Sequence, residues 1–188
     1  MKKKTSPVEI VVIADRSGSM DAIRADAIGG YNAFLAEQQK IKGAANLTLI
    51  LFDHEYIVAE DAVPLKNAKP LTTETYVPRG DTALNDAIGR SLASLEAKKP
   101  DKAIVCILTD GAENASSEFT TAQVRQKISD AEKAGWKIVY LSADANAFAH
   151  SAAFGISKDA TVKFNANGAG VRSAYATATA STTNYRGK

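Results

Sequence analysis

The sequence predicts a doubly wound α/β fold, a Rossmann-like three-layer sandwich around a mostly parallel sheet. Short apolar runs with buried-strand character recur along the chain, and segments with helical periodicity lie between them. This alternation is typical of a parallel sheet that is covered by helices on both faces. The chain has 188 residues, which is enough for one well-buried domain and too short for two ordinary ones.

Six segments are expected to form the sheet. Apolar runs predict five of them, and the remaining one follows the second run after only a few polar residues. That gap is too short for a crossover, so this pair should be a hairpin with one antiparallel edge strand. We expect the order 3-2-1-4-5-6 for the strands 8–14, 47–52, 56–59, 103–108, 136–141 and 160–164.

Helical periodicity fills most of the gaps between the predicted strands. Apolar residues share one helical face in the segment 23–35 and again in 84–95. A third helix is expected around 124–131, where Thr120 and Gln123 have the spacing of a capping box. These helices separate the strands that the parallel sheet requires.

The C-terminal part of the chain predicts two further helices. A short one is expected over 146–154, and a last one should end near Thr179, because threonine disfavours helix and the apolar face thins to alanine. We therefore expect a single domain over 8–180, a flexible basic tail over 1–7 and a frayed tail over 181–188.

Composition and charge narrow the possible partners. Lys and Arg number 23 against 21 Asp and Glu, and a net charge of +2 does not favour nucleic acid. No segment approaches the ~20 apolar residues of a membrane span, and no signal-peptide cleavage site follows the basic start. Cys106 is the only cysteine and lies in a predicted core strand, so we expect a buried inert thiol. We expect a cytoplasmic protein that is monomeric when alone.

Three oxygen-bearing side chains follow the first predicted strand at alternate positions. Asp15, Ser17 and Ser19 are short enough to converge, and Gly18 permits a tight loop between the serines. Magnesium takes a few short oxygen ligands and keeps several waters, so this loop could supply part of a cation site. On the loop alone, a polar turn that caps the next helix is an equal alternative.

Two further oxygen donors are expected at the same crevice. Thr82 opens a strongly periodic helix, and Asp110 closes the strand expected to lie beside the first one. Open parallel sheets bind ligands where the strand order reverses, which is where Asp15 and Asp110 would meet. A helix cap needs neither Thr82 nor Asp110, so the five residues together predict a metal site. Two carboxylates would neutralise a divalent ion and leave it able to accept another anionic oxygen.

These motifs resemble the metal-ion-dependent adhesion site of the von Willebrand factor A family, written Asp-x-Ser-x-Ser, a distant Thr and a distant Asp. The resemblance runs from about Val8 to about Phe164. It implies a bound divalent cation, with Mg²⁺ expected first and Mn²⁺ or Ca²⁺ as alternatives. It also implies direct ligation by the serines and the threonine, with the aspartates acting mainly through water. The implied metal ligands are Asp15, Ser17, Ser19, Thr82 and Asp110.

The resemblance implies a binding module rather than an enzyme. The missing ligand would be an Asp or Glu of a protein partner, such as an ATPase or an assembly component, as in intracellular bacterial or phage members. The alternative is a metal-dependent phosphoryl transferase or phosphohydrolase on a similar sheet. A haloacid dehalogenase-type enzyme would need Asp where Ser17 stands, and a response-regulator receiver would need Lys where Asp144 stands.

Residues that flank the motif are expected to form a partner-binding rim. The two arginines of this rim could steer an acidic ligand toward the metal. The expected rim residues are Arg16, Met20, Arg79, Asp81, Glu113 and Asn114.

Three other polar features carry separate expectations. The segment 53–55 (Asp-His-Glu) falls in the predicted hairpin turn and is expected to be a solvated turn. Asp86 could hold the site loop through hydrogen bonds, or could simply be an acid favoured at a helix N-terminus. His150 has no acidic neighbour in the sequence, so a structural histidine is expected there.

Overall fold

The computed structural model describes residues 6–187 and contains one six-stranded sheet in the order β3-β2-β1-β4-β5-β6. The predicted order 3-2-1-4-5-6 is therefore confirmed. All neighbouring strands are parallel except β3, which pairs antiparallel with β2 at the sheet edge, also as predicted. The strands are β1 (Val8–Asp15), β2 (Ala45–Phe52), β3 (Tyr56–Pro64), β4 (Ala103–Thr109), β5 (Lys137–Ser142) and β6 (Thr161–Lys163).

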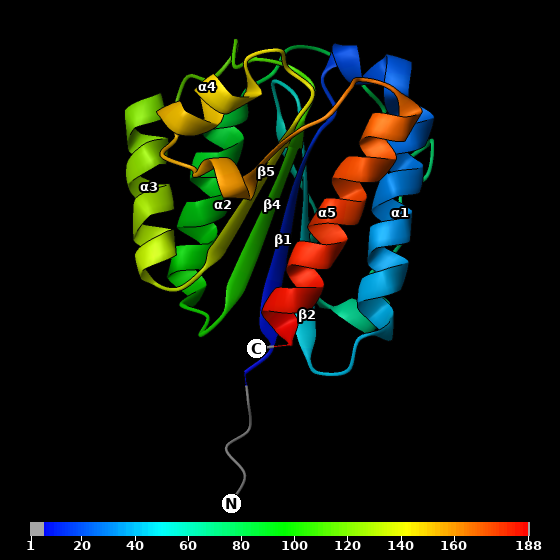
Figure 1. The fold of residues 1–188 in the computed structure, drawn as a ribbon, viewed down its shortest axis with the longest axis vertical. Coiled ribbons are helices and arrows are strands. Elements are labelled where there is room, and N and C mark those ends of the chain that lie inside the picture. Colours follow the sequence, from blue (N-terminus) through cyan, green and yellow to red (C-terminus); the bar gives the residue numbers. More distant parts are fainter. Residues whose placement is uncertain (1–5, 188) are drawn as a thin grey trace, which may run out of the picture.

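Helices cover both faces of the sheet and complete the three layers (Figure 1). One layer contains α1 and α5, which pack against each other, and the other contains α2, α3 and the short α4. The helices are α1 (Arg24–Lys40), α2 (Leu84–Lys98), α3 (Thr121–Lys133), α4 (Ala147–Ala153) and α5 (Gly168–Arg186). Three short 3-10 turns accompany them, η1 (Gly18–Ile23), η2 (Leu65–Asn67) and η3 (Lys158–Ala160).

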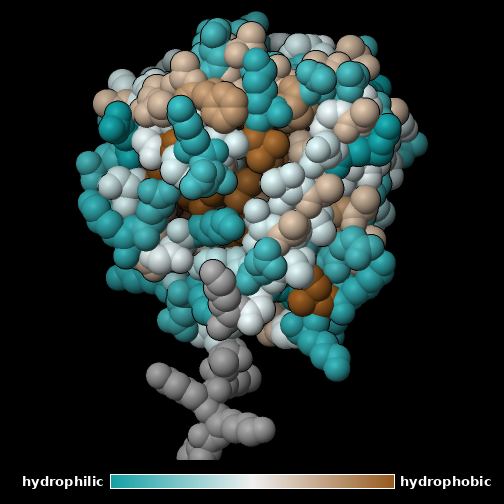
Figure 2. Space-filling view, in the orientation of Figure 1, coloured by the Kyte–Doolittle hydropathy of each residue, from teal (hydrophilic) through white to brown (hydrophobic). Residues whose placement is uncertain are grey.

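Each face of the sheet has its own hydrophobic core. Alternate residues of β1 point to opposite faces, so Ile10 and Val12 pack toward α1 and α5, whereas Val11 and Ile13 pack toward α2 and α3. In Figure 2 the hydrophobic colour appears mainly in the middle of the view, between the two helical layers. Within residues 6–187, no helix is long and apolar enough to cross a membrane.

The last helix is longer than predicted. Helix α5 continues through Arg186, so the expected end near Thr179 is wrong, and so is the frayed tail for residues 181–186. Thr182 is completely buried, and the Arg186 guanidinium donates hydrogen bonds to the carbonyls of Gln38 and Ile41 at the end of α1. Packing against α1 therefore outweighs the weak helix propensity of the threonines. Residues 1–5 and 188 of the predicted tails lie outside the described residues.

Strand β1 lies between β2 and β4, where the order of the sheet reverses. The register places Asp15 opposite Phe52 of β2, and Ala14 opposite Leu108 of β4. The parallel strands all end at the upper edge of Figure 1, so the loops that follow β1, β2 and β4 gather there. This arrangement brings chemically active residues from distant segments to one edge of the sheet.

Candidate metal centre

Asp15 is the innermost residue of the site and is completely buried at the end of β1. Its Oδ1 accepts a hydrogen bond of 2.7 Å from the Ser17 backbone N–H, which tightens the loop that follows. Its Oδ2 accepts a hydrogen bond of 2.6 Å from the Thr109 hydroxyl, at the end of the neighbouring strand β4. The Tyr76 hydroxyl donates to the Asp15 backbone carbonyl. Neither Thr109 nor Tyr76 was expected from the sequence to contact the site.

The two serines and the second aspartate form a connected row. The hydroxyl oxygens of Ser17 and Ser19 lie 3.2 Å apart. The Ser19 hydroxyl donates to Asp110 Oδ1 at 2.8 Å, which joins the loop after β1 to the loop after β4. Ser17 is buried, whereas Ser19 is exposed and Asp110 is half-buried, so the row leads from the interior to solvent.

Thr82 approaches the same place from the long connection between β3 and α2. A Cβ atom added to Gly111 would lie 3.4 Å from Thr82 Oγ1 and 3.9 Å from Ser19 Oγ, so both hydroxyls border the space beside this glycine. The Thr82 backbone N–H donates to Asn114 Oδ1 at 2.8 Å, and its carbonyl accepts from the Asn114 N–H at 3.0 Å. The structure thus brings the five predicted ligand residues together from three loops.

The two aspartates of the site are not paired with a cationic side chain in the part of the chain that the structure describes. Burial raises the pKa of Asp15 to about 6, against hydrogen bonds from Thr109 and Ser17 that lower it. Burial also raises the pKa of Asp110. Within residues 6–187, neither carboxylate forms an ion pair with Lys, Arg or His. A buried carboxylate without a countercharge is unfavourable, and a bound cation would remove that cost.

The donor set also fits a hard divalent cation. Two carboxylates and three hydroxyls offer only oxygen, carried on the short side chains that Mg²⁺ accepts when it keeps waters in its shell. No group of three or more His, Cys, Asp or Glu residues able to hold a metal occurs in the described part of the chain. The candidate site is therefore a mixed carboxylate and hydroxyl site, and softer ligands are not part of it.

The predicted rim is only partly present. Met20 is completely buried and Arg16 is 7% exposed, so neither forms an exposed rim. Met20 instead lies in the turn η1, directly before α1, and packs in the hydrophobic core on that face of the sheet. Of the other residues expected in the rim, Arg79, Asp81 and Asn114 are exposed and Glu113 is half-buried.

Glu113 and Asp86 are engaged in holding the loop after β4. The Glu113 carboxylate accepts hydrogen bonds from the backbone N–H groups of Asn85 and Ser116, at 2.6 and 2.7 Å. The Asp86 carboxylate accepts from the backbone N–H groups of Ser117, Glu118 and Phe119. Of the two expectations for Asp86, the structure therefore favours the role of holding a loop.

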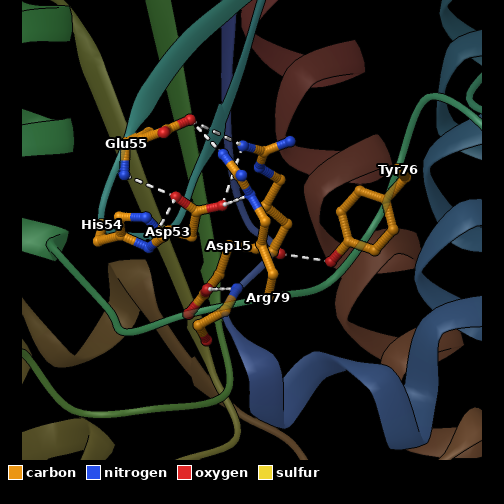
Figure 3. Close-up of polar contacts among 8 residues, drawn as sticks. Asp15, Asp53, His54, Glu55, Tyr76 and Arg79 are labelled. Atoms are coloured by element: carbon orange, nitrogen blue, oxygen red, sulfur yellow. Dashed lines mark hydrogen bonds and ion pairs between the residues drawn. The ribbon is translucent and has the colours of Figure 1, made fainter.

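The segment Asp53-His54-Glu55 is not simply a solvated turn, because Asp53 is completely buried. Its Oδ2 lies 2.9 Å from Arg16 Nη2 and 3.0 Å from Arg79 Nε, and its Oδ1 accepts a hydrogen bond of 2.6 Å from the Glu55 N–H. Glu55 also pairs with Arg79 (Figure 3). Both arginines are therefore committed to these acids, which does not support their predicted role in steering a ligand.

His150 and Cys106 carry the two remaining expectations. His150 does have an acidic neighbour, since its Nδ1 lies 3.7 Å from Asp144 Oδ1, although the two are six positions apart. Cys106 is buried as expected, and burial raises the pKa of its thiol to about 11, which leaves it protonated and unreactive near neutral pH.

No protein-family model matches the sequence, and no curated protein matches it. Solved structures are similar in fold. The von Willebrand factor domain of the type V pili tip protein from Porphyromonas gingivalis matches with TM-score 0.73 and 12% identity, over 98% of this chain and 97% of that chain. The PilB minor pilin from Streptococcus sanguinis matches with TM-score 0.73 and 11% identity, over 99% of this chain and 63% of that chain.

A third similar structure carries a metal in the motif that the sequence resembles. It is the proximal thread matrix protein 1 from the mussel byssus with a zinc-occupied adhesion-site motif, at TM-score 0.65 and 14% identity. The match covers 93% of this chain and 48% of that one, so the chain spans less than two thirds of both the pilin and the matrix protein. The sheet order, the helical layers and these matches together show that the chain has the fold of a von Willebrand factor A domain.

Proposed function

We propose that this chain is a metal-dependent protein-binding module. The observation that carries the proposal is the meeting of Asp15, Ser17, Ser19, Thr82 and Asp110 at one edge of the sheet, where neither carboxylate pairs with a cationic side chain of residues 6–187. These five residues would hold a divalent cation, for which Mg²⁺ is our first choice and Mn²⁺ or Ca²⁺ the alternatives. When bound, the cation would supply an open coordination position for one more anionic oxygen.

The chain's own residues would prepare that position in three ways. Thr109 and the Ser17 N–H fix both oxygens of Asp15, so the innermost carboxylate cannot rotate freely. Ser19 and Asp110 lie toward solvent, where a partner could approach. Two carboxylates only balance the charge of a divalent cation, so the site is nearly neutral. The cation could therefore accept the Asp or Glu of a protein partner as a further anionic ligand. An ATPase or an assembly component is the kind of partner that we propose.

Metal binding can be tested by calorimetric titration of the metal-free protein with MgCl₂ and MnCl₂. We expect binding by the wild type, and a loss of affinity of at least about 10-fold in the Asp110→Ala variant. The matched control is Asp144→Ala, because this half-buried acid follows the neighbouring strand β5 and lies outside the five proposed ligands. Equal affinity of the wild-type and Asp110→Ala proteins would rule out the proposed site.

Partner binding is a separate part of the proposal. A partner captured from the native host should be released by EDTA and should be lost in the Thr82→Ala variant. Capture that persists in EDTA would contradict a metal-mediated contact. Hydrolysis of p-nitrophenyl phosphate that requires Mg²⁺ and Asp15 would instead favour the phosphohydrolase alternative. A cytoplasmic location and a monomeric state remain predictions, and the similar structures from pili and a byssus lend the former no support.

A further inference from the structure

Asp53 is the first residue after β2 and lies beside the end of β1 that carries Asp15. The register pairs Asp15 with Phe52, so Asp53 begins the adjacent loop. Its side chain has no exposed surface, and it faces a buried guanidinium, since the Arg16 side chain is only 9% exposed. A buried acid and base in this arrangement are energetically dependent on each other, because either one alone would be an uncompensated buried charge.

The Asp53 carboxylate joins two of the loops that supply the proposed ligands. Arg16, which it contacts at 2.9 Å, stands between the proposed ligands Asp15 and Ser17. Arg79, which it contacts at 3.0 Å, stands three positions before Thr82. Figure 3 shows Asp53 between the turn of His54 and Glu55 on one side and Arg79 on the other.

Backbone hydrogen bonds connect the same two loops. The Arg79 N–H donates to the Arg16 carbonyl at 2.8 Å, and the Gly18 N–H donates to the Gly80 carbonyl at 3.0 Å. The backbone carbonyl of Asp53 itself accepts from the Ala83 N–H at 2.9 Å, next to Thr82. The loop of Ser17 and Ser19 and the loop of Thr82 are therefore fixed to each other at several points. Asp53 adds to these ties through its side chain and through its backbone carbonyl.

We infer that Asp53 is a positioning residue for the metal centre, which sets the Ser17 and Ser19 loop against the Thr82 loop by binding Arg16 and Arg79. This inference rests on the proposed function. Asp53 itself would not touch the cation, because its oxygens are already used by the two arginines and by the Glu55 N–H. It also supplies negative charge beside two guanidinium groups that would otherwise repel a cation bound nearby.

The Arg79 half of this arrangement can be removed without disturbing the core. The Arg79 side chain is 45% exposed, so its ion pair contributes little to overall stability, although it lies on the Thr82 loop. Arg79→Gln should therefore leave a folded protein in which one tie between the loops is missing. Arg90→Gln is the matched control, because Arg90 is 40% exposed and makes a similar pair with Glu118 away from the proposed ligands.

The experiment measures Mg²⁺ and Mn²⁺ affinity by calorimetry in the wild type, Arg79→Gln, Asp53→Asn, the double variant and Arg90→Gln. Circular dichroism melting identifies the temperature at which each protein is folded, and the titrations are made there. We expect about a 10-fold loss of affinity in Arg79→Gln and in Asp53→Asn, no change in Arg90→Gln, and a double variant weaker by less than the product of the single losses. Such non-additivity is the expected sign that Asp53 acts through Arg79.

The possible failures of this experiment point to different conclusions. If the wild type binds metal and the folded Arg79→Gln and Asp53→Asn proteins bind it equally tightly, the positioning role of Asp53 is wrong and the proposed function stands. If fully multiplicative losses appear in the double variant, Asp53 does not act through Arg79, and the inference is again overturned. If the wild type binds neither Mg²⁺ nor Mn²⁺, the proposed function fails first and this inference falls with it.

Discussion

Asp15 and Asp53 lie at the ends of neighbouring strands, and Asp53 is one position further along because the register pairs Asp15 with Phe52. Each aspartate is completely buried at the point where a central parallel strand ends. Each accepts a hydrogen bond from the backbone N–H two residues ahead, at 2.7 Å from Ser17 and at 2.6 Å from Glu55. The two strand ends thus share the same local hydrogen bond between an aspartate side chain and the backbone.

The two aspartates differ in what compensates their charge. Asp53 has two arginines within ion-pair distance, whereas Asp15 has the Thr109 hydroxyl and, in the described part of the chain, no cationic side chain. A buried aspartate at a strand end can therefore serve structure or leave a charge available to a ligand. The identity of the neighbouring side chain decides between these roles, and the strand end itself does not.

The largest expected effect on stability comes from removing the carboxylate charge of Asp53, which the two arginines compensate. Asp53→Asn keeps an acceptor for the Glu55 N–H, but among residues 6–187 it leaves the buried Arg16 with Glu55 as its one acidic partner, 3.9 Å away. We expect a loss of about 3 kcal/mol in the free energy of unfolding, because removing one partner of a buried pair leaves the other charge uncompensated. Urea denaturation in EDTA measures this loss without any contribution from metal.

The control for this substitution is Glu55→Gln. The Glu55 side chain is 52% exposed, and solvent replaces its interactions, so its removal should cost less than about 1 kcal/mol. A similar cost for the two variants would show that burial of Asp53 does not distinguish it from its exposed neighbour.

The sheet order and the meeting of the five proposed ligands at one edge were predictable, because each of these residues stands at or close to the end of an apolar or strongly periodic segment. The role of Asp53 was not predicted, because the polar residues between β2 and β3 have the composition of an exposed turn. A usable signal was nevertheless present in the sequence. Arg16 comes just after a mostly apolar strand and needs a countercharge if it is buried, and the predicted order places the loop after β2 beside it.

The C-terminal helix illustrates a second limit of sequence reasoning. Its threonines predicted an early end, whereas α5 continues to Arg186. Tertiary contacts decide this segment, since the Arg186 guanidinium donates to the carbonyl groups of Gln38 and Ile41 at the C-terminal end of α1. Neither contact can be read from propensity, because the two partners lie nearly the whole chain apart.

A smaller effect of opposite sign is expected at Asp15. In EDTA at pH 7, Asp15→Asn should raise the free energy of unfolding by about 1–2 kcal/mol, because it removes a buried charge that has no cationic partner among residues 6–187. Asparagine can still accept from the Ser17 N–H, and the Thr109 hydroxyl can still donate to the Gly111 carbonyl at 3.2 Å. Saturating Mg²⁺ should then stabilise the wild type and leave the variant unchanged, as thermal melting would show.

The sign of this effect can be checked by changing the pH. The pKa of Asp15 rises from its ordinary value of 3.8 to about 6 in the folded protein, so folding favours the protonated form. The contribution of Asp15 to stability is fully present below about pH 4 and is lost as the pH rises through about 6. The advantage of Asp15→Asn should therefore disappear near pH 4. An advantage that persists there would mean that charge burial is not its cause.

The smallest of the three effects concerns the backbone carbonyls of the same two aspartates. The Asp53 carbonyl accepts from a backbone donor, the Ala83 N–H, whereas the Asp15 carbonyl accepts from the Tyr76 hydroxyl, which a substitution can remove. Tyr76→Phe keeps the buried ring and leaves this carbonyl unsatisfied, so we expect a loss of about 1 kcal/mol in the free energy of unfolding.

Tyr185→Phe provides the matched comparison for Tyr76→Phe. The Tyr185 hydroxyl donates to the Gly135 carbonyl at 2.8 Å, but Gly135 is exposed, so water can replace the lost bond and the expected cost is below about 0.5 kcal/mol. Urea denaturation of both variants in EDTA measures the difference. If the two losses are equal, the Tyr76 hydroxyl is not needed to satisfy the end of β1. Asp15 would then differ from Asp53 only in the charge around its side chain.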